Sequence, residues 1–193
     1  MKNQVKLRVC DKLFSISKFP LSTKYDPNCE QEAIEILQKC PNLAKEMWLG
    51  PDNNGDPFVY GSTALHYTAN DGKITSMRQL IEFGADVNAH QAKWYATPMA
   101  WAANNAHISA IRLLLAAGGN INGANIVHAA AFGGSSCGSD ETKDYLGTLK
   151  FLHDNGADMN SQIFRDKLTP LSLAIESGNK KAQEFLRSIG AVE

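Results

Sequence analysis

Two histidines occupy the same place in two copies of a short sequence motif, where imidazoles could bind a metal ion or transfer protons. His66 lies in the copy at residues 63–69, and His128 lies in the copy at residues 125–131. A metal ion held by both side chains would have to bridge two separate units of the chain. No cysteine or carboxylate recurs beside either histidine at ligand spacing. We therefore reject a metal site and expect these rings to hydrogen-bond buried polar groups.

The remaining candidates for catalysis are one cysteine and three carboxylates. Cys137 lies among glycine and serine residues, whereas a catalytic cysteine needs a fixed base and a charge or helix that lowers its pKa. Asp52, Asp56 and Glu30 fit solvated turns and helix starts better than paired acid–base groups. Residues 1–62 contain no triad, phosphate loop or metal cluster. We predict that the chain is not an enzyme and uses no catalytic residue, metal or cofactor.

The elements that carry these residues follow from a pattern that occurs four times. Each copy opens with a short motif, continues into an apolar helical segment and stops at a glycine. The copies run from Thr63 to Gly84, Thr97 to Gly118, Asn125 to Gly156 and Thr169 to Gly190. Three of these intervals are 21 residues and one is 31, so the repeated unit determines the fold.

Residue types at both ends of the unit predict where its helices begin and end. Thr97 and Thr169 can cap a helix through their hydroxyls, with proline at the first helical position after each. The four terminal glycines favour the left-handed conformation that ends a helix. We expect two helices per unit.

Apolar residues in the unit predict one shared core. In the first helices the inward residues are Leu65, Met99, Val127 and Leu171, and small residues that allow close stacking are Ala102, Ala103, Ala130 and Ala174. In the second helices the core residues are Met77, Leu80, Ile81, Ile111, Leu114, Leu115, Leu149, Leu152, Phe185 and Leu186.

Each of the first three glycines is followed by a tetrapeptide similar to Ala-Asp-Val-Asn, at residues 85–88, 119–122 and 157–160. With the openings similar to Thr-Pro-Leu-His, the chain resembles the ankyrin-repeat family, whose unit is about 33 residues. The resemblance implies an all-α solenoid of helix-turn-helix units with short hairpin fingers. It also implies that His66 and His128 bond the backbone and the capping threonine across neighbouring units.

The resemblance suggests a division of the chain into three parts. Residues 1–18 are an N-terminal extension, residues 19–62 are a degenerate capping repeat with a loop, and residues 63–193 hold four repeats. The repeats are expected at 63–96, 97–124, 125–168 and 169–193, with an insertion at about 135–144. A cap is needed because a bare repeat exposes its apolar stacking face.

Composition excludes several classes of function. A formal net charge of -1 argues against general nucleic-acid binding, and no apolar run approaches the length that spans a membrane. No paired motif joins Cys10, Cys29, Cys40 and Cys137, so a disulfide scaffold is not expected. We expect a soluble, cytoplasmic monomer.

One finger departs from the pattern by carrying large aromatic residues. Trp94 and Tyr95, within residues 90–95, stand where the family has small polar residues, and such side chains are favoured binding anchors. Packing against the preceding finger through Phe58 and Tyr60 is the alternative.

We predict that another protein binds the concave face formed by the fingers and first helices. The candidate binding residues are His90, Lys93, Trp94 and Tyr95 on one finger, Phe164 and Arg165 on another, and Tyr67 and Trp101 on the helical surface. Trp101 could belong to the core instead. The segment from Gly118 to Asn125 is 7 residues long, against 13 for its two counterparts, which predicts a gap in the row of fingers.

Three functions are compatible with these features. The first is a non-catalytic adaptor, scaffold or stoichiometric inhibitor. The second is a secreted bacterial effector of the ankyrin type that engages a host protein in the host cytoplasm, with further activity in residues 1–60. An enzyme is the weakest alternative, because residues 63–190 are committed to the scaffold.

Overall fold

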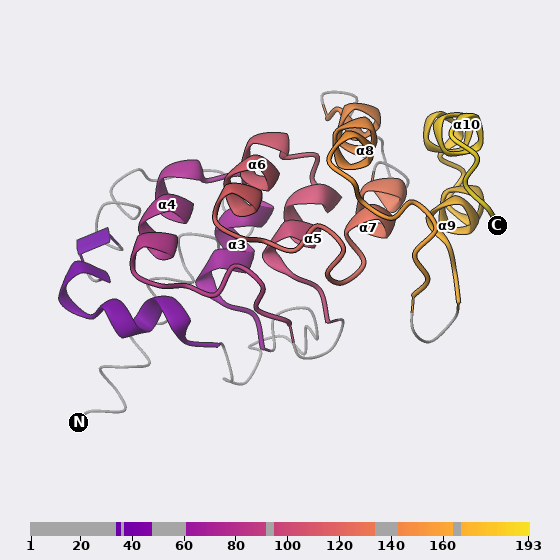
Figure 1. The fold of residues 1–193 in the computed structure, drawn as a ribbon. Coiled ribbons are helices and arrows are strands. Elements are labelled where there is room, and N and C mark those ends of the chain that lie inside the picture. The colour runs from indigo at the N-terminus through magenta and orange to yellow at the C-terminus, as the bar shows by residue number, and fades with distance from the viewer. Residues whose placement is uncertain (1–33, 36, 48–60, 92–94, 134–142, 164–166) are drawn as a thin grey trace.

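The structure, a computed structural model, describes residues 34–35, 37–47, 61–91, 95–133, 143–163 and 167–193. Within these ranges the protein is a row of stacked helix pairs (Figure 1). The first helices of the pairs are α3 (Ala64–Asn70), α5 (Pro98–Asn104), α7 (Ile126–Phe132) and α9 (Pro170–Glu176). The second helices are α4 (Ile74–Glu82), α6 (Ile108–Ala116), α8 (Tyr145–Asp154) and α10 (Lys180–Ser188). The predicted all-α solenoid is confirmed.

The predicted threonine caps are present at the starts of two first helices. The hydroxyl of Thr97 accepts a hydrogen bond of 3.3 Å from the backbone N–H of Ala100. Thr169 caps α9 in the same way, at 3.1 Å from the N–H of Ser172. Asn125 precedes α7 with φ -31° and ψ 38°, and its side chain makes no capping bond. The third repeat therefore starts differently from its neighbours.

The predicted glycine stops also adopt the left-handed conformation. Their φ values are +84° at Gly84, +89° at Gly118, +83° at Gly156 and +77° at Gly190. After the first stop, the N–H of Ala85 bonds the carbonyl of Leu80 at 2.9 Å and closes the helix end. This turn directs the chain away from each second helix.

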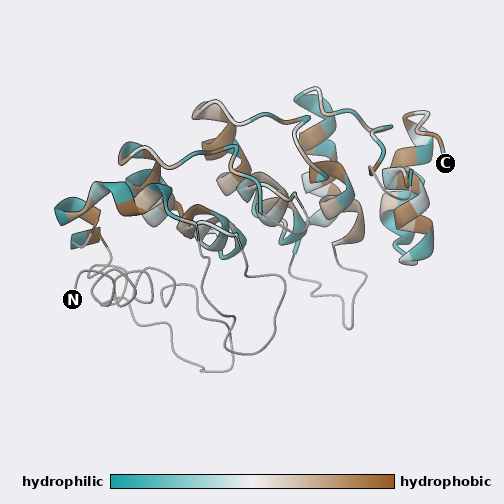
Figure 2. Ribbon diagram, turned by 90° about the horizontal axis from the view of Figure 1, so that it is seen from below, coloured by the Kyte–Doolittle hydropathy of each residue, from teal (hydrophilic) through white to brown (hydrophobic). Residues whose placement is uncertain are grey.

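Small and branched apolar residues form one core along the stack. The predicted alanines of the first helices are fully buried, and Leu65, Met99, Val127 and Leu171 are at most 3% exposed. First helices contact one another in order, from α3 to α9. Hydrophobic and hydrophilic residues alternate around the helices that Figure 2 shows, as expected for amphipathic helices in a layered array.

The N-terminal part of the described chain covers the start of the stack. Its short 3-10 helix η1 (Pro41–Lys45) buries Leu43 and Ala44, and Leu37 is also buried. Met47 pairs with Thr63 in an isolated antiparallel bridge. The start of the predicted capping repeat, at residue 19, lies outside the described residues. Within the described part, every helix is too short or too polar to cross a bilayer.

Candidate functional site

The first finger is residues 85–96, and backbone hydrogen bonds join its described parts, residues 85–91 and 95–96. The N–H of Gln91 bonds the carbonyl of Ala96 at 2.9 Å, and the N–H of Tyr95 bonds the carbonyl of Gln91 at 3.0 Å. Gln91 is fully buried at the base of this turn. The backbone that presents Tyr95 is thus fixed from both sides.

Tyr95 is the most exposed of the large hydrophobic residues in the described chain, with 68% of its surface accessible. Its φ is +53°, in the left-handed region that side chains disfavour. Nδ1 of His90 lies 2.9 Å from the Tyr95 carbonyl oxygen and donates to it, because a carbonyl only accepts. His90 is itself exposed, so both residues stand on the surface as predicted.

The third finger is residues 157–168, and its described parts, residues 157–163 and 167–168, repeat this bonding with Lys167 in the position of Tyr95. The N–H of Ile163 bonds the carbonyl of Leu168 at 3.1 Å, and the N–H of Lys167 bonds the carbonyl of Ile163 at 3.0 Å. Lys167 has φ +51° and is exposed. Lys167 is therefore the structural counterpart of Tyr95.

Asparagines at the fourth tetrapeptide position tie each finger to the next repeat. Oδ1 of Asn88 accepts from the N–H of Asn120 at 2.8 Å, and Oδ1 of Asn122 accepts from the N–H of Asp158 at 2.8 Å. Oδ1 of Asn160 continues the series, at 2.9 Å from the N–H of Val192. We name these three residues, Asn88, Asn122 and Asn160, the asparagine ladder.

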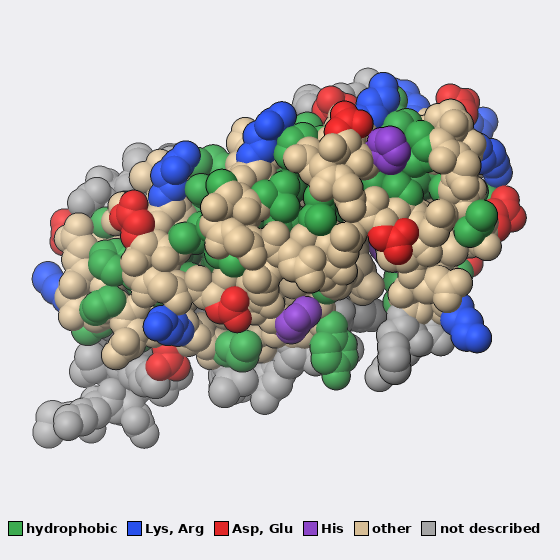
Figure 3. All heavy atoms as spheres, viewed as in Figure 1, with side chains coloured by type: hydrophobic (Ala, Val, Ile, Leu, Met, Phe, Trp, Pro, Cys, Tyr) green, Lys and Arg blue, Asp and Glu red, His purple; other side chains and the backbone are tan. Residues whose placement is uncertain are grey.

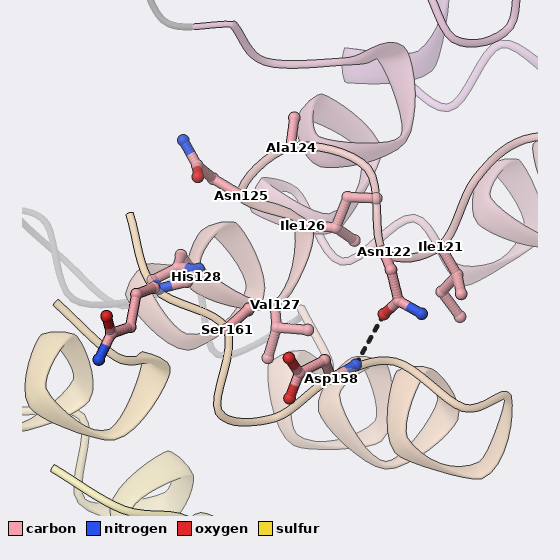
Figure 4. Close-up of a pocket in the computed structure, with 10 residues that line it drawn as sticks. Ile121, Asn122, Ala124, Asn125, Ile126, Val127, His128, Asp158 and Ser161 are labelled. Carbon is pink, nitrogen blue, oxygen red and sulfur yellow. Dashed lines mark hydrogen bonds between the residues drawn. The ribbon is translucent and has the colours of Figure 1, made fainter. Parts of the chain in front are cut away.

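The second finger, residues 119–124, is the predicted short one. It turns through a 3.0 Å bond from the N–H of Gly123 to the carbonyl of Asn120, and Ala124 has φ +40°. A cavity of about 110 Å³ lies between this turn, the start of α7 and the third finger (Figure 4). Its lining residues are Ile121, Asn122, Ala124, Asn125, Ile126, Val127, His128, Asp158, Ser161 and Gln162.

His66 has the structural role predicted for it. Its Nδ1 accepts the N–H of Thr63 at 3.1 Å and lies 2.9 Å from the Thr63 hydroxyl, while Nε2 lies 3.1 Å from the carbonyl of Ala96. The histidine thus joins its own helix start to the base of the first finger. Burial lowers the pKa of His66 to about 4, so the imidazole is neutral near pH 7.

His128 keeps only half of this arrangement. Its Nε2 lies 2.8 Å from the carbonyl of Leu168, at the base of the third finger. Its Nδ1 is buried and has no hydrogen-bond partner in the described chain, because Asn125 replaces the threonine that serves His66. Burial also lowers the pKa of His128. The predicted bond to a capping threonine is thus wrong for this residue.

The expectation that Tyr67 is exposed is wrong. Tyr67 is 5% exposed, because the ring of Trp101 from the next repeat covers it at 5.4 Å between centroids and an angle of 80°. Trp101 is half-buried and also makes an edge contact with His66, at 5.4 Å and 72°. The rings of His66, Tyr67 and Trp101 therefore form one cluster. Trp101 packs against the neighbouring repeat, which is the alternative to an exposed position that the sequence analysis gave for it.

Other predicted residues lie outside the described part of the chain. They are the binding candidates Lys93, Trp94, Phe164 and Arg165, the packing alternatives Phe58 and Tyr60, and Cys137, Asp52, Asp56 and Glu30. Within the described ranges, the structure gathers no three His, Cys, Asp or Glu side chains that could hold a metal ion. In the view of Figure 3, acidic and basic side chains are interspersed with neutral and hydrophobic ones.

Sequence reasoning missed the asparagine ladder and the cavity beside His128. The recurrence of asparagine in the tetrapeptides was the signal for the ladder. In comparisons with known proteins, a family model described as ankyrin repeats (3 copies) matches residues 31–125 and 65–162. A search of curated proteins found no match.

Proposed function

The chain belongs to the ankyrin-repeat family, whose repeats are generally protein-interaction modules, and from this premise we propose that it is a non-catalytic adaptor, scaffold or stoichiometric inhibitor. Its partner is another protein, which binds the face formed by the fingers. The observation that carries the proposal is the exposed Tyr95 at a strained position of the first finger.

Retaining tyrosine at this position destabilises the folded chain. A side chain in the left-handed conformation costs about 1 kcal/mol relative to glycine, and burial in the folded monomer does not offset this for a ring that is 68% exposed. Tyrosine is enriched among residues that dominate binding energy, since it combines a large apolar ring with a hydroxyl. Burial of the ring against a partner protein would explain why tyrosine occupies this strained position.

The described parts of the fingers are held in place before a partner arrives. The asparagine ladder and the closing bonds at Gln91 and Ile163 hold this part of the backbone. Association therefore loses less conformational entropy than it would with mobile loops. In this proposal the contact face includes two exposed left-handed positions, the aromatic Tyr95 and the basic Lys167.

The experiment compares two glycine variants. Tyr95→Gly removes the ring and relieves the backbone, while Lys167→Gly relieves the same backbone geometry without removing an aromatic group. Tagged wild type and both variants are used to capture proteins from native cell extract, and the affinity for each captured protein is then measured by calorimetry. We expect Tyr95→Gly to lose at least about 2 kcal/mol of binding free energy while unfolding at higher urea than wild type.

Lys167→Gly should match the stability gain and keep most of the affinity. A partner that binds the wild type and Tyr95→Gly equally well would refute the assignment of this finger as the anchor. Loss of binding in both glycine variants would instead show that backbone rigidity, and not the tyrosine ring, carries the interaction.

A further inference from the structure

Three second helices carry a basic residue at the same position of the repeat. Arg78 on α4, Arg112 on α6 and Lys150 on α8 each precede the terminal glycine of their repeat by six residues. Each is the one lysine or arginine of its helix, and all three are exposed. Figure 3 shows Lys and Arg side chains along the upper edge of the molecule, over these helices. We call Arg78, Arg112 and Lys150 the basic row.

The helices that carry the basic row are neighbours. Cα atoms of α4 and α6 approach within 8 Å of each other. The guanidinium carbon of Arg112 lies 4.4 Å from the centre of the Phe151 ring on α8, and Phe151 directly follows Lys150. Packed helices have axes about 8–10 Å apart, so we expect a similar separation between successive members of the row.

Carboxylates of the described chain form no ion pair with the basic row. The ion pairs between described residues join His153 to Asp154 and Arg187 to Glu193. Like charges at successive positions of the row therefore repel one another in the folded chain. A partner that brings carboxylates to the row replaces this repulsion with attraction.

Arg112, at the centre of the row, is the member best prepared to bind a carboxylate. A cation–π contact holds its guanidinium over the Phe151 ring, so part of its side-chain freedom is lost before a partner arrives. Its N–H donors can bind one carboxylate through two parallel bonds. Four residues after Arg112 stands the uncharged Ala116, whereas the equivalent residues of α4 and α8 are the acidic Glu82 and Asp154.

The row ends at α10, where Glu184 occupies the equivalent position with the opposite charge. It is exposed and precedes Gly190 by six residues. A long polyanion such as nucleic acid would continue past the row onto this carboxylate, and the formal net charge of the chain is -1. Anionic membranes are bound by clusters of about 4–8 basic residues, more than the row contains. A short acidic segment of a protein fits the row better than either.

The separation of the helices favours an acidic segment in an extended conformation. A polyproline II helix has about three residues per turn and rises about 3.1 Å per residue. Every third side chain therefore lies on the same edge of such a segment, about 9 Å from the last. This distance matches the separation of about 8–10 Å between packed helices.

We propose that the basic row binds an extended acidic segment of a partner protein. Carboxylates at every third residue of that segment pair with Arg78, Arg112 and Lys150, and the central pair, at Arg112, is bidentate. The inference goes beyond the proposed function, because the row lies on the second helices and not on the fingers.

The test uses the full chain and the capped peptide (Asp-Pro-Pro)₃, with (Asn-Pro-Pro)₃ as its uncharged control. Backbone amide resonances of α4, α6 and α8 are followed by NMR at about 0.01 M salt, where the screening length is about 30 Å. We expect saturable shifts with the aspartate peptide and none with the asparagine peptide. Arg112→Gln should weaken binding about threefold. Lys39→Gln changes the net charge equally, at an exposed position before η1, and should leave the affinity unchanged.

Glu184→Lys is the second variant, because it extends the row to α10. Its affinity for (Asp-Pro-Pro)₄ should exceed that of wild type about threefold. No saturable shift with the aspartate peptide, or equal affinity of Arg112→Gln and wild type, would refute the basic row. Tighter binding of a thymidine oligonucleotide than of the peptide would identify a general polyanion site and overturn the proposal. Tyr95→Gly should bind the peptide as wild type does, so failure of the basic row and failure of the proposed function are separate outcomes.

Discussion

Nε2 of His66 lies 3.1 Å from the carbonyl oxygen of Ala96, which links the start of α3 to the base of the first finger. This bond, with the two contacts to Thr63, holds the imidazole fully buried and uncharged. The His66 imidazole is therefore harder to protonate in the folded chain than in the unfolded chain.

Stability should fall on mild acidification. Burial lowers the pKa of His66 from 6.5 to about 4, so between these values the unfolded state binds more protons than the folded state. The stabilising contribution is complete above pH 6.5 and is lost as pH falls toward 4. We expect a loss of about 2 kcal/mol between pH 7 and pH 5, measured by urea unfolding. His66→Gln should be less stable at pH 7 but less sensitive to pH, and an unchanged slope would contradict this.

Ala106→Gly should stabilise the protein. Ala106 has φ +59° at a turn where the first and last repeats have Gly72 and Gly178, at φ +64° and +71°. Removing the side chain relieves left-handed strain, for an expected gain of about 1 kcal/mol in free energy of unfolding. Ala116→Gly, in the last turn of α6, should lose about 0.5–1 kcal/mol. A loss of stability in Ala106→Gly would show that the strain is not stored there.

Asn122→Ala should loosen the junction between the second and third fingers. The substitution removes the acceptor of the Asp158 N–H and the 3.4 Å bond to the carbonyl of Gly156. We expect a loss of about 1–2 kcal/mol and faster hydrogen exchange at the Asp158 amide, measured by NMR. Asn104→Ala, at an exposed position of α5, is the control. It should change neither the free energy of unfolding nor the hydrogen exchange of the Asp158 amide. Unchanged exchange at Asp158 would mean that the ladder does not hold the fingers.

Asn125→Thr should also raise stability, independently of any ligand. A threonine can cap α7 and satisfy His128, as Thr63 satisfies His66. We expect a gain of about 1 kcal/mol by thermal or urea unfolding. Asn125→Val has a similar shape without the hydroxyl and should not reproduce the gain. Equal stability of the two variants would exclude the hydroxyl as the cause.

The fold was predictable because its signals are local. Threonine caps, as at Thr97, and glycine stops, as at Gly84, act within one turn of helix, and their regular spacing fixed the units. Burial of Tyr67 was not predictable, because its cover, Trp101, comes from the next repeat.

Candidate site residues were harder to predict, since their roles depend on contacts between units. The pattern indicated Tyr95 by residue type but not its left-handed backbone. The unpaired Nδ1 of His128 accompanies a single change, from threonine to Asn125, at the start of α7. Such a difference between equivalent positions becomes visible only when the repeats are compared in three dimensions.

The uncapped start of α7 bears on how the array comes apart. Units that contact only their neighbours unfold first where local coupling is weakest, and here a helix without a side-chain cap begins beside the unfilled cavity. The second and third repeats are coupled here through the contact between α5 and α7 and not through a side-chain cap on α7. A partner that fills the cavity would add contacts at this junction.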